Sequence, residues 1–124
     1  MRHDRGALVR ELKAIHANFA RQHYPPHPAL LEAFDREGIV FWEQIPVWRV
    51  RGKQLRNPRF RATALSALRQ AILRDRNHAS VVAWSVSNET LRGGSGEVTY
   101  LRAARDLVSS LDSTRLLAAD KALL

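Results

Sequence analysis

The sequence predicts an α/β fold of the (β/α) barrel type. Segments with helical periodicity alternate with short apolar runs, and this alternation is typical of a parallel sheet built from right-handed crossovers. The connections that lead into the strands are short, whereas those that follow the strands are long and polar or rich in proline. This asymmetry favours a barrel, where the loops after the strands build the functional site. A doubly wound sheet is the alternative, but no glycine-rich phosphate turn follows any predicted strand.

The first part of the chain is expected to hold two helices and two strands. Apolar side chains every third or fourth position predict a helix over about residues 5–17, followed by a short strand over 19–22. A second helix is expected to begin at Pro28, where a helix tolerates proline, and to end at Gly38. Residues 39–42 are β-branched and aromatic, which predicts a strand buried on both faces.

The second part of the chain continues the alternation. A third helix is expected over about 58–76, since Asn-Pro marks its start, and a second buried strand over 81–86. The glycines of 93–96 predict a flexible loop. The apolar spacing over 101–111 predicts another amphipathic helix, and 115–119 begins a last strand.

The charge balance is the one unusual feature of the composition. Twenty Lys and Arg residues stand against twelve Asp and Glu residues, which gives a net charge of +8 over 124 residues. Such a surplus suits contacts with nucleic-acid phosphates. The basic residues are scattered, however, and the densest group lies in an expected loop over 47–57 and just beyond it, with no nucleic-acid-binding motif. We therefore predict no nucleic-acid partner.

The sequence also bears on membranes and on redox chemistry. The longest apolar runs are far shorter than a membrane span, so no membrane contact is expected. The chain has no cysteine, which excludes disulfides, zinc knuckles and thiol nucleophiles within it. No apolar stretch follows residues 1–5, so no secretory signal is expected and a cytoplasmic location is favoured.

Polar side chains that could carry chemistry follow the predicted strands, where a barrel builds its site. Cationic, imidazole, amide and carboxyl groups of this kind bind sugars, together with aromatic platforms such as Trp42, Trp48 and Trp84. A carboxyl group near apolar rings can have its pKa raised and then act as a general acid. The candidates are Arg21, His23 and Tyr24 after the first strand, Glu43 and Gln44 after the second, and Asn88 and Glu89 after the third.

Each candidate has a structural alternative. Glu89 could be a solvent-exposed loop carboxylate, and His23 could be a structural hydrogen-bonding group. Trp42 and Trp84 fit a core at least as well as a sugar platform. His78 follows a helix and precedes a strand, so we expect it at the opposite end of the barrel, where it would brace the structure.

One stretch of the chain resembles a known family signature. Residues 74–89 read RDRNHASVVAWSVSNE, which is similar to R-D-x-N-H-P-S-V-x-x-W-S-x-x-N-E of glycoside hydrolase family 2, with Ala79 as the departure. Further blocks at 23–25, 38–46 and 111–115 resemble the family in order and spacing. The resemblance implies that residues 1–124 are a central fragment of a TIM-barrel catalytic domain, covering about barrel strands 2 to 5 with the intervening helices.

The resemblance also implies a function and the roles of individual residues. Family members hydrolyse β-glycosides, such as β-galactosides or β-glucuronides, with retention of configuration. Glu89 matches the general acid/base, and Asn88 matches the residue that binds the sugar 2-hydroxyl. His23 matches a pocket-lining histidine, and Arg21 an arginine that supports the nucleophile. Glu43 is expected to have a supporting role in substrate binding.

Trp84 lies within the signature and is counted among the expected substrate-binding residues. In the metal-dependent branch of the family, Glu and His ligands follow the strand at 39–42, but residues 45–51 contain neither. We therefore predict no metal site and no cofactor.

The family's nucleophile has no counterpart in this chain. It is a second Glu at the end of barrel strand seven, about 5–5.5 Å from the acid/base in a retaining enzyme. We therefore expect little or no turnover from the 124-residue chain by itself. Half a barrel leaves two sheet edges unpaired, and association through these edges is a further expectation. The alternative function is a non-catalytic carbohydrate-binding or assembly remnant of such a barrel.

Overall fold

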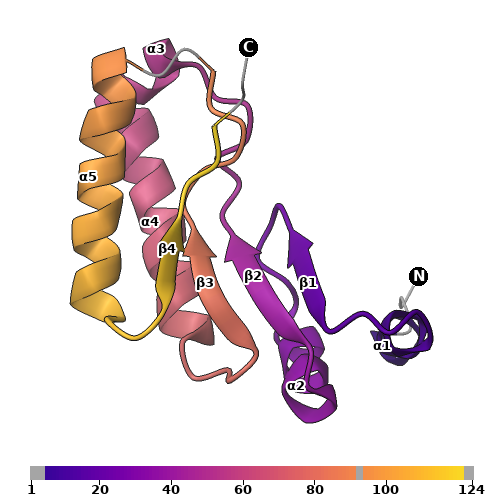
Figure 1. Cartoon of the computed structure of the whole chain (residues 1–124). Helices are drawn as coiled ribbons and strands as arrows, with labels where there is room; N and C mark the ends of the chain where they lie inside the picture. The colour runs from indigo at the N-terminus through magenta and orange to yellow at the C-terminus, as the bar shows by residue number, and fades with distance from the viewer. Residues whose placement is uncertain (1–4, 92–93, 122–124) are drawn as a thin grey trace.

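The structure, a computed structural model, describes residues 5–91 and 94–121 and contains a parallel four-stranded sheet (Figure 1). Each strand pairs with the next one along the chain, so the order in the sheet is β1-β2-β3-β4. The strands are β1 (Phe19–Gln22), β2 (Val40–Gln44), β3 (Val81–Ser85) and β4 (Leu116–Ala118). Sequential parallel strands joined by helices confirm the predicted α/β fold and its identification as part of a TIM barrel.

Helices lead into or connect all four strands. They are α1 (Arg5–Ala14), α2 (Pro28–Glu37), α3 (Gly52–Leu55), α4 (Pro58–Asp75) and α5 (Gly94–Leu111). The side chains of His27 and Asn57 cap α2 and α4 by accepting hydrogen bonds from backbone N–H groups of the first turn. Helix α2 ends at Gly38, whose φ of 67° lies in the left-handed region that favours glycine. None of the helices in the described part of the chain could span a membrane.

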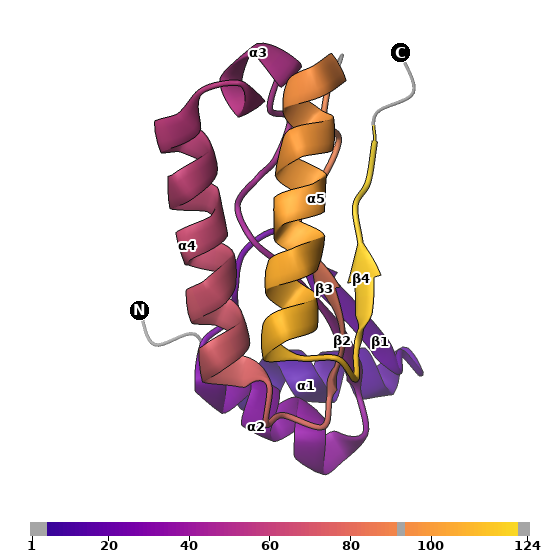
Figure 2. The same cartoon turned by 90° about the vertical axis from the view of Figure 1, so that its left-hand side faces the viewer.

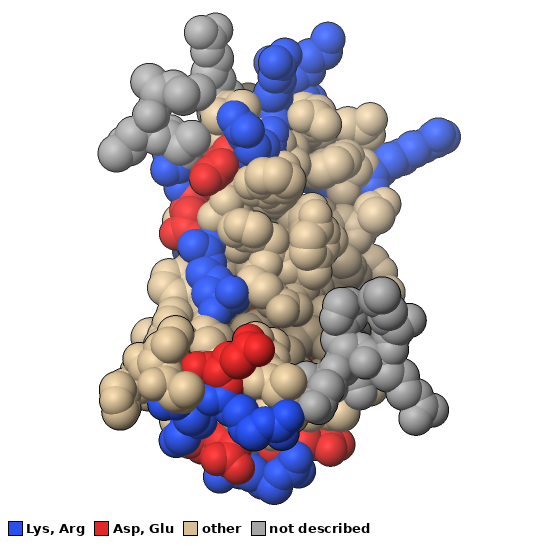
Figure 3. All heavy atoms as spheres, turned by 90° about the vertical axis from the view of Figure 1, so that its right-hand side faces the viewer, with Lys and Arg blue, Asp and Glu red and all other residues tan. Residues whose placement is uncertain are grey.

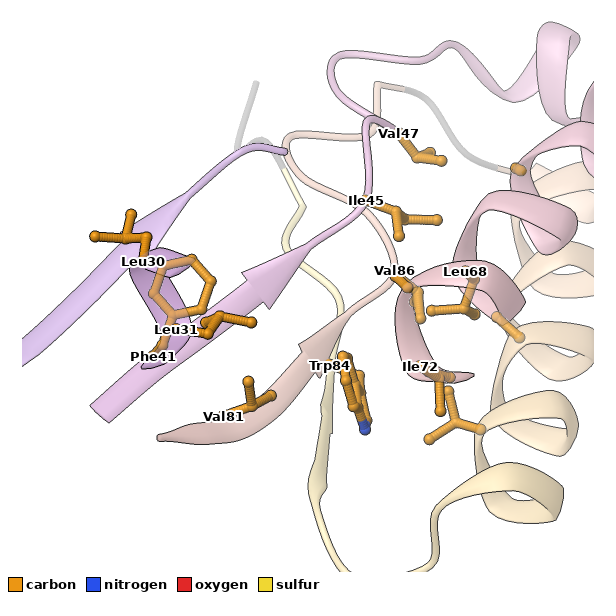
Figure 4. Close-up of a cluster of buried hydrophobic side chains, with 14 of the residues drawn as sticks. Leu30, Leu31, Phe41, Ile45, Val47, Leu68, Ile72, Val81, Trp84 and Val86 are labelled. Atoms are coloured by element: carbon orange, nitrogen blue, oxygen red, sulfur yellow. The ribbon is translucent and has the colours of Figure 1, made fainter. Parts of the chain in front are cut away.

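Helices α2, α4 and α5 cover one face of the sheet, whereas α3 lies beyond the ends of the strands (Figures 1 and 2). Helices α4 and α5 run side by side along β3 and β4, whereas α2 lies near β1 and β2 (Figures 1 and 2). Figure 4 shows the buried apolar side chains between these two layers. Leu68 and Ile72 of α4 approach the buried side chains of Trp84 and Val86. The core therefore lies between the helices and the sheet, as the helix periodicity predicts.

The other face of the sheet carries no helix among the described residues. Figure 3 shows this side of the molecule, with a broad uncharged area between charged groups at both ends. Phe19 of β1 is 46% exposed and Leu116 of β4 is 72% exposed. Such side chains line the packed interior when a barrel is closed. Residues 39–42 are accordingly not buried on both faces, because Val40 is exposed in this structure.

Two predicted loops contain helical structure. The basic loop over 47–57 includes the short helix α3, and residues 94–96 form the first turn of α5 instead of a flexible loop. Gly93 lies outside the described residues. A Cβ atom at Gly96 would come within 2.7 Å of the carbonyl oxygen of Gly52, so this glycine allows α5 to begin in contact with α3. That close approach depends on tertiary packing, which the local composition does not reveal.

His78 braces the end of the sheet where the strands begin. Its Nδ1 lies 2.6 Å from Asp35 Oδ2, and the Ser80 N–H donates to Asp35 Oδ1 at 2.7 Å. Arg115 donates to the His78 carbonyl at 2.9 Å. The bracing role expected for His78 is confirmed, and it lies at the opposite end of the strands from the candidate site.

Candidate active site

The loops after β2 and β3 run side by side beyond the ends of these strands. The Asn88 N–H donates to the Val47 carbonyl at 2.8 Å, and the Arg49 N–H donates to the Asn88 carbonyl at 2.9 Å. Further along, the Leu91 N–H donates to the Val50 carbonyl at 3.0 Å. These bonds extend the parallel pairing of β2 and β3 and fix the register of the two loops. Side chains that follow the two strands are thereby brought to the same edge of the sheet.

Arg21 is the hub of the polar side chains at this edge. Its Nη2 donates to Gln44 Oε1 at 2.9 Å, to Asn88 Oδ1 at 2.5 Å and to Asp120 Oδ2 at 2.5 Å. The guanidinium carbon lies 5.2 Å from the centre of the Trp42 ring. One cation at the end of β1 therefore links the last residue of β2 to the segments that follow β3 and β4.

His23 joins the same group of side chains. Its Nδ1 lies 3.1 Å from Gln44 Oε1, the oxygen that also accepts from Arg21. Its ring stacks on the Trp48 ring, with the two centres 5.7 Å apart and an angle of 7° between the planes. The histidine therefore connects the Arg21 hub to the loop after β2.

Glu89 lies beside this loop with a half-exposed carboxylate. Trp48 Nε1 donates to Glu89 Oε2 at 3.3 Å, and Arg49 Nε lies 3.7 Å from the same oxygen. The backbone of Glu89 has a φ of 50°, which is uncommon for a residue other than glycine. Glu89, Asn88, His23 and Arg21 thus occupy one edge of the sheet, at the ends of β1 and β3, which flank β2.

The structure turns Glu43 away from this edge. Side chains alternate along a strand, so Gln44 faces Arg21 while Glu43 faces α4. The Glu43 side chain is buried, and its carboxyl oxygens accept no hydrogen bond from the described residues. Burial, together with the negative charge of Asp75, raises the pKa of Glu43 to about 9, although Arg74 and Arg115 oppose the rise. Glu43 therefore lies within the helix-side core and does not join the candidate site.

Trp84 is also placed away from the site. Its side chain is 1% exposed and packs on the helix side of β3 (Figure 4). Its Nε1 donates to Asp112 Oδ2 at 2.9 Å, and the Arg115 guanidinium carbon lies 5.9 Å from its ring centre. Trp84 was expected to contact substrate, but its side chain lies in the core. It pairs with Glu43 in the register between β2 and β3, and both side chains point to the helix side of the sheet.

The binding of Gln44 and Asp120 to Arg21 was not predicted from the sequence. Gln44 was grouped with Glu43, although strand alternation separates the two side chains and puts only one of them beside Arg21. Asp120 follows β4 and binds Arg21, and its position after the last strand was the available signal. Tyr24 is exposed and makes no side-chain hydrogen bond to the cluster within the described residues.

The described residues also limit what the site could hold. Within 5–91 and 94–121, no group of three or more His, Asp and Glu side chains is arranged to hold a metal ion. The polar groups at the site are two guanidinium groups, one imidazole, one indole N–H, two amides and two carboxylates. These groups are suited to donating and accepting hydrogen bonds around hydroxyl-rich ligands.

Comparisons with known proteins identify relatives of the chain. The family model described as "Glycosyl hydrolases family 2, TIM barrel domain" matches residues 3–122. A β-glucuronidase of Paenibacillus borealis is 37% identical over 114 residues, covering 84% of this chain and 19% of the relative. The β-galactosidase BoGH2A of Bacteroides ovatus is 38% identical over 106 residues, covering 73% of this chain and 12% of the relative.

Solved structures show the same likeness. The structure of Bifidobacterium dentium β-glucuronidase complexed with coumarin-3-O-glucuronide aligns with a TM-score of 0.86 and 28% sequence identity. The alignment covers 93% of this chain and 20% of that protein. The chain therefore spans about a fifth or less of the length of these three relatives.

Proposed function

The chain belongs to the TIM-barrel domain of glycosyl hydrolases family 2, and from this premise we propose that it supplies the acid/base half of a retaining β-glycosidase site. The observation that carries the proposal is the meeting of Glu89, Asn88, His23 and Arg21 at the ends of β1 and β3. The substrate is a β-glycoside such as a β-galactoside or a β-glucuronide. Relatives that carry the names of both activities support this range.

Glu89 acts as the general acid and then as the general base. In the first step its carboxyl proton passes to the glycosidic oxygen while the bond from that oxygen to the sugar carbon breaks. The sugar carbon bonds to a carboxylate nucleophile that lies outside this chain. In the second step Glu89 takes a proton from water as the water oxygen displaces that nucleophile, which restores both carboxyl groups.

The neighbouring side chains bind and orient the sugar. Asn88 accepts from Arg21 through its Oδ1, while its Nδ2 is buried without a hydrogen-bond partner in the described part of the chain. A buried amide N–H without a partner is costly, and a sugar hydroxyl oxygen can accept from it. This geometry supports Asn88 as the group that binds the sugar 2-hydroxyl. His23 and Arg21 border the same space.

The chain by itself is expected to have little or no turnover. Four strands of an eight-stranded barrel are present in it, and none of its carboxylates matches the nucleophile's motif. The test therefore uses a completed barrel, in which residues 3–122 replace the matched segment of the β-glucuronidase relative. We expect this protein to hydrolyse aryl β-glycosides with retention, whereas the 124-residue chain does not.

The decisive variant in the completed barrel is Glu89→Gln. Loss of a general acid/base lowers kcat by roughly 10²–10⁴-fold. Glu32→Gln is the matched control, because Glu32 is an exposed glutamate on α2 at a distance from the site. Activity that survives in Glu89→Gln at the level of the control would refute the assignment.

A second candidate function is a non-catalytic carbohydrate-binding or assembly module. The exposed apolar face around Phe19 and Leu116, and the outer edges of β1 and β4, favour association. Sedimentation velocity of the chain over a range of concentrations tests assembly directly. A chain that binds sugar equally well with Glu89→Gln, while the completed barrel stays inactive, would favour the binding module.

A further inference from the structure

The loop after β2 presents two neighbouring side chains to the Glu89 carboxylate. Trp48 pairs with Asn88 in an isolated parallel bridge, which sets Trp48 and Arg49 opposite Asn88 and Glu89. Arg49 has a φ of 52° and Glu89 a φ of 50°. Left-handed backbone at a residue other than glycine is energetically costly and is often retained at functional sites. Both positions of this facing pair therefore depart from ordinary loop geometry.

The two side chains contact the same oxygen of Glu89. Trp48 Nε1 donates to Oε2 at 3.3 Å, and Arg49 Nε lies 3.7 Å from Oε2. Among the described residues, none makes a hydrogen bond or ion pair to the other carboxyl oxygen, Oε1. One oxygen of the carboxyl group is thus held by the loop, and the other stays available to exchange a proton with a bound molecule.

Trp48 is itself held by the site. Its ring stacks on His23, and His23 hydrogen-bonds Gln44, which accepts from Arg21. Trp48 is about half exposed, so this stacking and the bond to Glu89 are what fix its ring. The orientation of the Glu89 carboxyl group is therefore linked through one indole ring to the groups at the ends of β1 and β2.

We propose that Trp48 and Arg49 are positioning residues that hold Glu89 Oε2 and leave Oε1 facing the glycosidic oxygen. The proposal rests on the acid/base role of Glu89 proposed above. It assigns to Trp48 a role different from a sugar platform, because its ring lies against His23 and its N–H is directed at Glu89. A misplaced catalytic group loses much of its effect, which is why such a clamp matters.

The contact itself is tested on the 124-residue chain by NMR. The three tryptophan indole N–H signals are assigned with single Trp→Phe variants. We expect Glu89→Ala to shift the Trp48 signal and to speed exchange of its proton with solvent, while the signals of Trp42 and Trp84 stay in place. Glu32→Ala is the control and should move none of them. An unchanged Trp48 signal in Glu89→Ala would overturn the proposal.

The positioning role is tested by leaving-group dependence in the completed barrel, which does not require the isolated chain to be stable. A glycoside with a poor leaving group needs the acid, whereas a dinitrophenyl glycoside does not. We expect Trp48→Phe and Arg49→Ala to lower kcat/KM, which reports the acid-assisted first step, roughly ten- to hundredfold for alkyl glycosides and to change it little for dinitrophenyl glycosides. Arg49→Lys should retain most of the activity on alkyl glycosides that Arg49→Ala loses.

Failure of the positioning role can be distinguished from failure of the proposed function. A uniform loss of kcat/KM across leaving groups, or no loss for either substrate, would overturn the positioning role while leaving the acid/base role intact. Absence of hydrolysis by the unmutated completed barrel would instead refute the proposed function.

Discussion

The protein holds two clusters of charged side chains, one at the ends of the strands and one between the sheet and the helices, and the two differ in burial. At the ends of the strands, Arg21 and Glu89 are partly exposed, and so are Asp120 and Arg49, which pair with them. Behind the sheet, Asp112 and Asp75 are buried and bound by arginines. The first arrangement leaves polar groups available to a ligand, whereas the second satisfies them internally. The first should therefore govern activity and the second stability.

The buried cluster is centred on Asp112, which bonds to Trp84 of β3 and to Arg115, the residue just before β4. Its carboxylate accepts from Trp84 Nε1 and Arg115 Nη1, and Arg115 also donates to the Val81 carbonyl at 2.7 Å. Burial by itself raises the pKa of Asp112, but hydrogen bonds from Thr114, Trp84 and Arg115 hold this pKa well below its usual range. The aspartate therefore stays ionised inside the protein.

The largest expected effect on stability comes from Asp112→Ala. The change removes the carboxylate partner of the buried Trp84 indole N–H and of the largely buried Arg115 guanidinium, and breaking such a pair costs about 3–5 kcal/mol. Asp106→Ala, in the helix α5 that precedes Asp112, is the matched control, because the pair of Asp106 with Arg105 is exposed and is worth about 0–1 kcal/mol. Urea denaturation of both variants measures the difference. Equal losses would show that the contrast in burial does not govern stability.

The second prediction concerns the pH dependence that Glu43 imposes. Its pKa is about 9 in the folded chain, against an ordinary value of 4.5, so the folded state keeps a proton that the unfolded state releases. Stability contributed by this group is therefore present below about pH 4.5 and is lost as the pH rises toward 9. Glu43→Gln, with a neutral side chain of the same shape, should flatten this fall.

Denaturation midpoints measured at several pH values test the prediction for Glu43. The comparison is between the slopes of wild type and variant, since other groups titrate equally in both. Parallel slopes would mean that Glu43 is ionised in the folded chain.

The smallest expected effect on stability comes from Arg21→Ala in the candidate active site. Arg21→Ala removes hydrogen bonds that are partly open to solvent, so the free energy of unfolding should fall by only about 1 kcal/mol. The same change in the completed barrel should lower kcat/KM far more than that loss of stability explains. Thermal melts and kinetics on the same preparation test this separation. A stability loss as large as that of Asp112→Ala would remove the contrast between the two clusters.

The sequence predicted the order of helices and strands better than it predicted which face of the sheet each side chain points to. Alternating periodicity gave the order of strands and helices, and the placement of His78 and Glu89 at opposite ends of the strands followed from it. Glu43 and Trp84 were assigned to the site because they lie near it in the chain. Their burial behind the sheet depends on strand alternation and on the register between β2 and β3, in which these two residues are partners.

The remaining differences depend on contacts between distant segments. The pairing of the loops after β2 and β3 brings Trp48 to Glu89, and the 41 residues between them hide this contact from local patterns. The approach of α5 to α3 at Gly96 is of the same kind. Such contacts become visible only when the topology is in place.

The central claim is that Glu89 is the acid/base of a retaining β-glycosidase. The most direct measurement uses Glu89→Ala in the completed barrel, with a dinitrophenyl β-glycoside and added azide. The activated leaving group needs no acid, and azide needs no base, so azide should restore turnover and give the β-glycosyl azide. If azide neither accelerates turnover nor appears in the product, while the unmutated completed barrel is active, Glu89 does not have this role.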